Sequence, residues 1–130
     1  MADYRIPRTG DRPLAFSGEL LAESDGELSE GQHNNRYHAL ALYRTASGRL
    51  VAHVAYHTEW VGEQESSTVY VADTPADLAD ALKSHNPCST LVGMPRGMEA
   101  RQASRDEWVR SRYLAQVGEV LSVLEPEQIP

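Results

Sequence analysis

Cysteine is almost absent from this sequence of 130 residues, which contains only Cys88. No disulfide can form within the chain, and this usage is typical of a reducing compartment. Long apolar runs are also missing, and the uncharged stretch over residues 86–95 contains two prolines and is too short to cross a bilayer. The first five residues hold no apolar segment of the kind found in a signal peptide. The sequence therefore predicts a cytoplasmic protein that makes no membrane contact.

Motifs that commonly carry chemistry are missing as well. The sequence contains no Cys-x-x-Cys, no His-Glu-x-x-His, no Gly-x-Ser-x-Gly and no glycine-rich phosphate loop. Cys88 lacks the usual neighbours of a cysteine nucleophile. The carboxylate pairs Glu63 with Glu65 and Asp77 with Asp80 fall in predicted loop or helix-surface positions, where we expect them to be solvated. We therefore predict no catalytic residue, no metal site and no cofactor, and we favour a non-enzymatic role.

Acidic residues outnumber basic ones by 19 to 12, which gives a net charge of −7. This excess argues against binding of nucleic acid over the whole surface. Hydrophobic residues make up 41% and charged residues 24% of the chain, as in an ordinary globular domain. A chain of this length builds one core, so we expect a single domain over 1–130. Within it, residues 1–12 should form a flexible arm and residues 125–130 a tail.

The clearest element in the sequence is a β-hairpin. Two stretches rich in β-branched and aromatic residues, 36–45 and 49–60, flank Ala46-Ser47-Gly48. A three-residue loop with glycine last is typical of a type I turn followed by a G1 bulge, because only the third residue needs a positive φ. This loop sets the register of the two strands. One face should then be buried and hold Leu40, Leu42, Val54 and Tyr56, while the other holds Tyr37, Ala41, His53 and His57.

Two more strands are predicted on either side of this hairpin. Alternating apolar and polar residues indicate a strand over 14–22, in which Gly18 is expected to form a bulge, and another strand over 66–72. Between the first strand and the hairpin, residues 23–35 are polar and rich in turn formers. We expect this segment to be a long exposed loop.

Two helices follow. Thr74 before Pro75 is typical of a helix start, and a helix is expected over 75–85. Ser104 begins a capping-box pattern ahead of apolar residues at helical spacing, which predicts a helix over 104–124 that residues 98–103 extend backwards. The predicted fold class is α+β, with a four-stranded antiparallel meander sheet and two helices packed on one face.

Two of the five histidines, His53 and His57, lie four residues apart on one strand face. That separation is about 13 Å along a strand, so the two cannot share one metal ion directly. The predicted register places Tyr37 opposite His57 on the same face. A small-ligand-binding protein or an enzyme would use this face, and a concave pocket in which either histidine meets a carboxylate would indicate such a role.

Charges of each sign gather in separate segments. No basic residue lies between positions 19 and 30, and this segment supplies the candidate binding residues Glu23, Asp25, Glu27 and Glu30. A negative segment of this kind suits a basic partner. Five arginines lie between positions 96 and 112, and among them Arg101 and Arg105 would share a helix face. These two are candidate contacts to nucleic acid, although pairing with nearby carboxylates explains part of the cluster.

One stretch of the chain resembles a known group of proteins. Its residues read Arg36-Tyr-His-Ala-Leu-Ala-Leu-Tyr-Arg-Thr-Ala-Ser-Gly-Arg-Leu-Val51, followed by Thr58-Glu-Trp-Val-Gly-Glu63. The pattern of Tyr-Arg-Thr, a glycine turn and Thr-x-Trp-x-Gly-Glu is similar to that of small uncharacterised bacterial proteins found on mobile elements. A looser likeness to the EXLDI family matches its closing motif with Glu119-Val-Leu-Ser-Val, which lacks the aspartate. The resemblance implies a cytoplasmic accessory protein and supplies no activity or site.

The sequence thus favours a non-enzymatic interaction protein that binds another macromolecule, expected to be a protein, through its sheet face or its acidic segment. A small-ligand-binding protein or an enzyme that uses the His-bearing face is the first alternative. Contact with nucleic acid through the arginines of residues 96–112 is the second.

Overall fold

The computed structural model describes residues 1–29 and 31–130. Its elements are β1 (Ala2–Arg8), β2 (Asp11–Asp25), β3 (Leu28–Ser29), β4 (Gln32–His33), β5 (Arg36–Thr45), β6 (Leu50–Thr58), β7 (Ser66–Ala72), α1 (Pro75–Ser84) and α2 (Glu99–Leu121). The main sheet of the described residues is antiparallel, in the order β1-β2-β5-β6-β7, and β3 and β4 form a separate hairpin. The predicted α+β class is confirmed, with five strands in the main sheet where four were expected.

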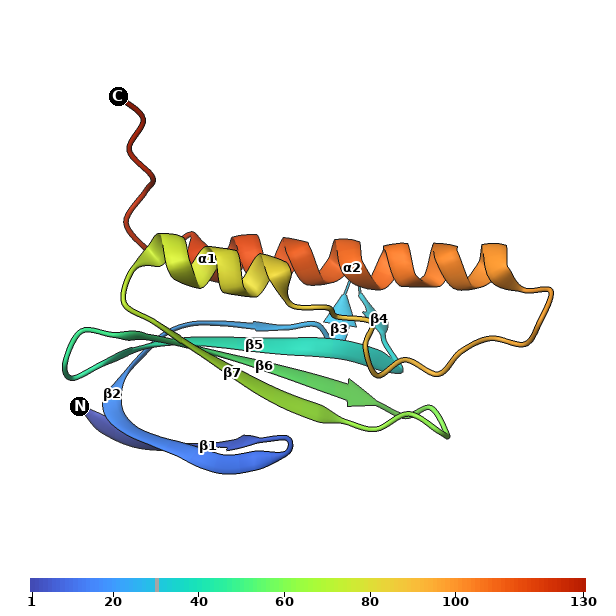
Figure 1. Cartoon of the computed structure of the whole chain (residues 1–130), viewed down its shortest axis with the longest axis horizontal. Coiled ribbons are helices and arrows are strands. Elements are labelled where there is room, and N and C mark those ends of the chain that lie inside the picture. The colour runs from blue at the N-terminus through green and yellow to red at the C-terminus, as the bar shows by residue number, and fades with distance from the viewer. Residues whose placement is uncertain (30) are drawn as a thin grey trace.

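The sheet is strongly curled, and the chain forms three layers. Figure 1 shows α1 and α2 over one face of β5, β6 and β7, while β1 and the first half of β2 fold beneath the other face. The Thr9 backbone N–H donates to the Ser67 carbonyl at 2.8 Å, which joins the end of β1 to β7 across the curl. We call the face toward β1 the inner face and the face under the helices the outer face.

The expected arm over residues 1–12 instead contains β1. Tyr4 and Ile6 alternate with polar residues, and Ile6 is only 4% exposed. This alternation did not predict a strand, because Pro7, Gly10 and several arginines nearby give the segment the composition of a loop. Gly10 takes φ +78° in the turn to β2, and Pro7 lies where the β1–β2 register shifts, as proline does on an edge strand.

Strand β2 is longer than predicted, and its irregularity lies elsewhere. The register against β5 shifts between Leu20 and Ala22, not at Gly18. Gly18 is required for another reason, because a Cβ there would lie 2.2 Å from the Arg44 carbonyl oxygen. The expected loop over 23–35 is also wrong in part, since β2 continues to residue 25 and the β3–β4 hairpin follows. Glu30 lies outside the described residues.

The predicted hairpin register is confirmed. Leu42 pairs with Ala52, Leu40 with Val54 and His38 with Tyr56. Gly48 has φ +91° in the connecting turn, the conformation that the three-residue loop requires.

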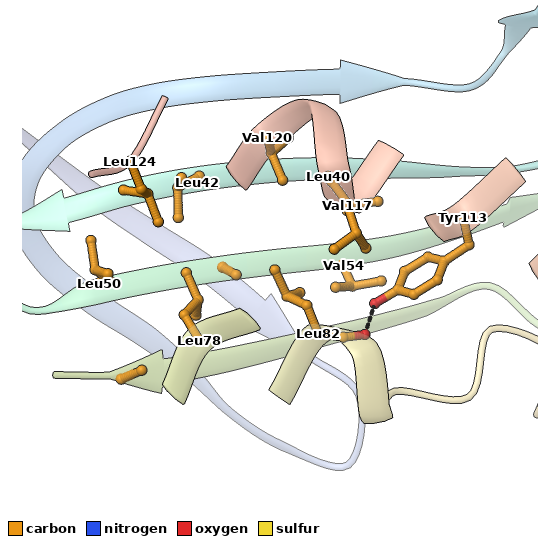
Figure 2. Packing of buried hydrophobic residues seen from close by; sticks show 12 residues of the cluster. Leu40, Leu42, Leu50, Val54, Leu78, Leu82, Tyr113, Val117, Val120 and Leu124 are labelled. Atoms are coloured by element: carbon orange, nitrogen blue, oxygen red, sulfur yellow. Dashed lines mark hydrogen bonds between the residues drawn. The ribbon is translucent and has the colours of Figure 1, made fainter. Parts of the chain in front are cut away.

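The main core lies between the outer face and the helices. Figure 2 shows leucines and valines of α1, α2, β5 and β6 meeting there, beside Tyr113, whose hydroxyl donates to the Leu82 carbonyl at 2.6 Å. Thr74 caps α1 as predicted, by accepting from the Asp77 backbone N–H. The capping box at Ser104 is wrong, because α2 begins at residue 99 and no side chain caps it.

The apolar stripe of α2 has the predicted helical spacing. Tyr113, Val117 and Val120 are at most 2% exposed, and Leu124 beyond the helix is also buried. Val120 lies within this cluster, and Leu121 is only partly buried against it. No helix in the described residues combines the length and the apolar character that crossing a bilayer requires.

Candidate functional site

The inner face is filled at one end and hollow at the other. Tyr43 packs against Tyr4 and Phe16 with ring centroids 4.7 and 5.3 Å away, and these aromatic rings belong to a second core beneath the sheet. Beyond Tyr43 the inner face opens into a hollow of about 520 Å³. We call this space the inner hollow.

Small residues create the inner hollow. In one row across four strands, Asp25 pairs with Ala39, Ala39 with Ala55, and Ala55 with Ser67. Neighbouring strands are about 4.8 Å apart, so the first and last residues of the row are about 14 Å apart, and the two alanines leave a low floor between their side chains. Ala41 continues this floor in the next row, beside His53.

Carboxylates lie around the alanine floor of the inner hollow. Glu23 and Asp25 come from β2, and Glu65 comes from the residue before β7. None of the described residues that line the inner hollow is a lysine or an arginine. His57 also lines it, with its Nδ1 2.8 Å from Oε2 of Glu65. The hollow therefore combines an apolar floor with a negatively charged rim.

Tyr37 stacks on His57 at the end of the sheet, with ring centroids 5.0 Å apart and planes at 29°. Burial raises the pKa of Tyr37, and the negative charges of Glu27, Asp25 and Glu65, with a further carboxylate nearby, raise this pKa further. The ring thus lies in a negative potential, and both the ring and the potential favour a cation.

His53 and Ser67 resemble a catalytic pair, with His53 Nε2 only 2.6 Å from Ser67 Oγ. The Ser67 hydroxyl also donates to the Pro7 carbonyl at 2.6 Å. A hydroxyl has one proton and a carbonyl can only accept, so His53 must donate to Ser67. Burial, and then the nearby His57, lower the pKa of His53, which keeps the ring neutral. This geometry ties β1, β6 and β7 together and does not activate the serine.

The structure brings together most of the residues singled out from the sequence. Glu23, Asp25, His53 and His57 line the inner hollow, and Tyr37 stacks at its edge. Glu27 follows β2, and its carboxylate lies 3.8 Å from His33. Glu30 lies outside the described residues.

The two predicted arginines lie elsewhere, on the first turns of α2. The guanidinium of Arg105 is 3.0 Å from the Asp106 carboxylate and also donates to the Val92 carbonyl. Arg101 is exposed. Neither lines the inner hollow.

A buried carboxylate was missed by the sequence analysis. Glu63 was expected to be solvated, but its side chain is fully buried and forms a salt bridge with Arg36. It also accepts from the Tyr56 hydroxyl at 2.6 Å, the Thr58 hydroxyl at 2.9 Å and the Val92 backbone N–H at 3.2 Å. Burial alone would raise the pKa of Glu63, but these hydrogen bonds outweigh it and lower the pKa to about 2.

The Glu63 cluster explains the Thr-x-Trp-x-Gly-Glu pattern physically. Arg36 lies 4.6 Å from the ring centroid of Trp60, and Gly62 takes φ +90° in the turn that returns Glu63 to the sheet. Thr58 both donates to Glu63 and accepts from the Trp60 backbone N–H. The pattern was the available signal for this cluster, whose role is to close the β6–β7 connection.

A second hollow of about 410 Å³ lies between β2, β5 and α2. His38 borders it and is only 4% exposed, with its ring 5.1 Å from that of Tyr56 and 5.3 Å from that of Tyr113. In the described part of the chain, no hydrogen bond to its ring nitrogens is found. Burial, and then His85 and His57, lower the pKa of His38 to about 4. His38 is therefore a neutral core residue.

Comparison of the chain with protein-family models, with curated proteins and with solved structures found no match. The function is therefore inferred from the geometry of the inner hollow and the charges around it.

Proposed function

We propose that this protein is a non-enzymatic interaction protein that binds a positively charged segment of a partner protein at the inner hollow. One observation carries the proposal. The acidic residues of β2 and the His-bearing face, which are separate in the sequence, line one hollow whose described lining contains no lysine and no arginine. Such a surface attracts a basic segment and disfavours an acidic one.

The direction of the hydrogen bonds at Ser67 supports a binding role over a catalytic one. A serine nucleophile must pass its proton to a neighbouring base, but the Ser67 proton is directed to the Pro7 carbonyl. His53 then holds β1 and β7 in place and does not accept a proton from the serine.

The small-ligand or enzyme alternative has one observation in its favour. His57 meets the Glu65 carboxylate in a hollow, which is the feature expected of that role. The two functions differ in which substitutions matter. Loss of function on replacing His53 or His57 singly, while the acidic residues tolerate charge reversal, would favour the alternative.

The proposal is tested with a labelled peptide of alternating arginine and glycine residues. The double variant Glu23→Lys/Glu27→Lys should weaken binding roughly tenfold or more, because two attractions become repulsions. The control Asp80→Lys/Glu107→Lys has the same net charge, but both of its changes are exposed and lie on the helices. It should bind the peptide within about threefold of the wild type. Equal binding by the wild type and both variants would refute the proposal.

A further inference from the structure

We infer that the inner hollow receives one arginine side chain of the partner protein, with its alkyl stem on the alanine floor and its guanidinium between the rim carboxylates. This inference rests on the proposed function and names the chemical group that is recognised.

The shape of the hollow indicates a long, slender side chain. Its floor is the directly paired Ala39 and Ala55, continued by Ala41, and a methyl group is the largest side chain on it. Tyr43 closes one end, where the second core fills the inner face. An apolar stem lying over these alanines would remove methylene groups from water while its charged end stayed at the rim.

The rim indicates a planar cation more than a compact one. Carboxylates flank the alanine floor on two opposite sides, with Asp25 on β2 and Glu65 just before β7. A guanidinium has five donors in a fixed plane and can satisfy carboxylates on two sides, whereas an ammonium is a single, strongly hydrated point charge.

An aromatic surface beside the rim favours the same group. The ring of Tyr37 stacks on His57, and His57 lines the hollow next to Glu65. Guanidinium groups stack on aromatic rings more readily than ammonium groups do. Arg36 and Arg112 line the second hollow, which shares Glu23 and Asp25 with the inner hollow, whereas Glu65 lines the inner hollow and not the second one.

The test uses an 11-residue peptide of glycine, serine and lysine in which one central position is arginine, lysine or citrulline. Citrulline keeps the shape of arginine and removes its charge. Binding is measured by calorimetry on the full chain. The arginine peptide should bind about tenfold more tightly than the citrulline peptide. It should also bind at least about threefold more tightly than the lysine peptide. Equal affinities for the three peptides in the wild type would overturn the inference.

Two variants locate the preference. Glu65→Gln should reduce the arginine-to-citrulline ratio at least threefold, whereas Glu19→Gln, an exposed position on β2 outside the hollow, should leave the ratio unchanged. Ala55→Leu should bring the arginine-to-citrulline ratio to about one, because the larger side chain would occupy the space above the alanine floor. If Ala55→Leu does not fold, Glu65→Gln decides alone, since it preserves the size of the side chain.

The outcomes separate the inference from the proposed function. If charge reversal at Glu23 and Glu27 weakens every peptide equally while Glu65→Gln and Ala55→Leu leave the ratio intact, the acidic surface binds basic segments but the hollow receives no side chain. If N-acetyl-arginine amide binds as tightly as the peptide, the occupant is a small molecule and the inference fails. If charge reversal has no effect on any peptide, the proposed function fails as well.

Discussion

Acid should destabilise this protein through His38, because the folded chain holds this histidine in its neutral form. The ring is 4% exposed, and its pKa is lowered from 6.5 to about 4, first by burial and then by His85 and His57. Between these two pKa values, His38 is therefore protonated in the unfolded chain and neutral in the folded chain. The contribution of the neutral ring is complete above pH 6.5 and is lost as the pH falls through 4. The lowered pKa corresponds to about 3 kcal/mol of unfolding free energy.

The variant His38→Phe isolates this effect, because it keeps a ring against Tyr56 and Tyr113 and removes the titration. Urea unfolding of both proteins is followed by circular dichroism at several values between pH 7.5 and 4. Contributions from the rest of the chain are common to both proteins and largely cancel in the difference. Relative to the variant, the wild type should lose about 3 kcal/mol over this range, mostly below pH 6. A difference that stays constant with pH would refute the assignment of His38 as a buried neutral residue.

Four further substitutions test the fold. Glu63→Gln should cost roughly 3–5 kcal/mol, because it leaves Arg36 with a neutral partner in a buried pair, and chemical denaturation measures this loss. Gly18→Ala should lower the melting temperature clearly, since its Cβ would lie 2.2 Å from a carbonyl oxygen of β5. Gly118→Ala, whose Cβ would contact nothing within 4 Å, should instead raise the unfolding free energy by about 0.5–1 kcal/mol in the same thermal scan. Leu42→Ala should cost roughly 2–5 kcal/mol in urea unfolding, and a midpoint equal to that of the wild type would show that Leu42 is not in the core.

Those parts of the fold that depend on local chemistry were predictable from the sequence. The loop ending in Gly48 needs one positive φ, and that requirement sets the register of β5 against β6. Thr74 followed by Pro75 likewise determined where α1 begins.

The second half of β2 could not be predicted by hydrophobic alternation, because its buried side is polar. Ser24 is 6% exposed, yet its hydroxyl donates to Glu119 and its carbonyl accepts from Gln116, both on α2. On the opposite side, Glu23 and Asp25 face a hollow in place of a packed layer. With polar residues on both sides, the segment resembles a loop in sequence.

The candidate site was predictable in its parts and not in their assembly. The register placed Tyr37, His53 and His57 on one face, and the charge pattern identified the acidic residues of β2. Their meeting depends on the pairing of β2 with β5 beyond the register shift at Leu20 and Ala22, and on the link from Thr9 to β7. Neither has a signature in the periodicity of the sequence.

Chemical-shift mapping of the isotope-labelled protein with the arginine peptide tests the central claim most directly. The account predicts that the largest changes fall on the methyl groups of Ala39 and Ala55 and on the rings of Tyr37 and His57, and that they disappear in the citrulline titration. Changes centred on the arginines of α2, or changes spread over the surface without a focus at the inner hollow, would contradict the account.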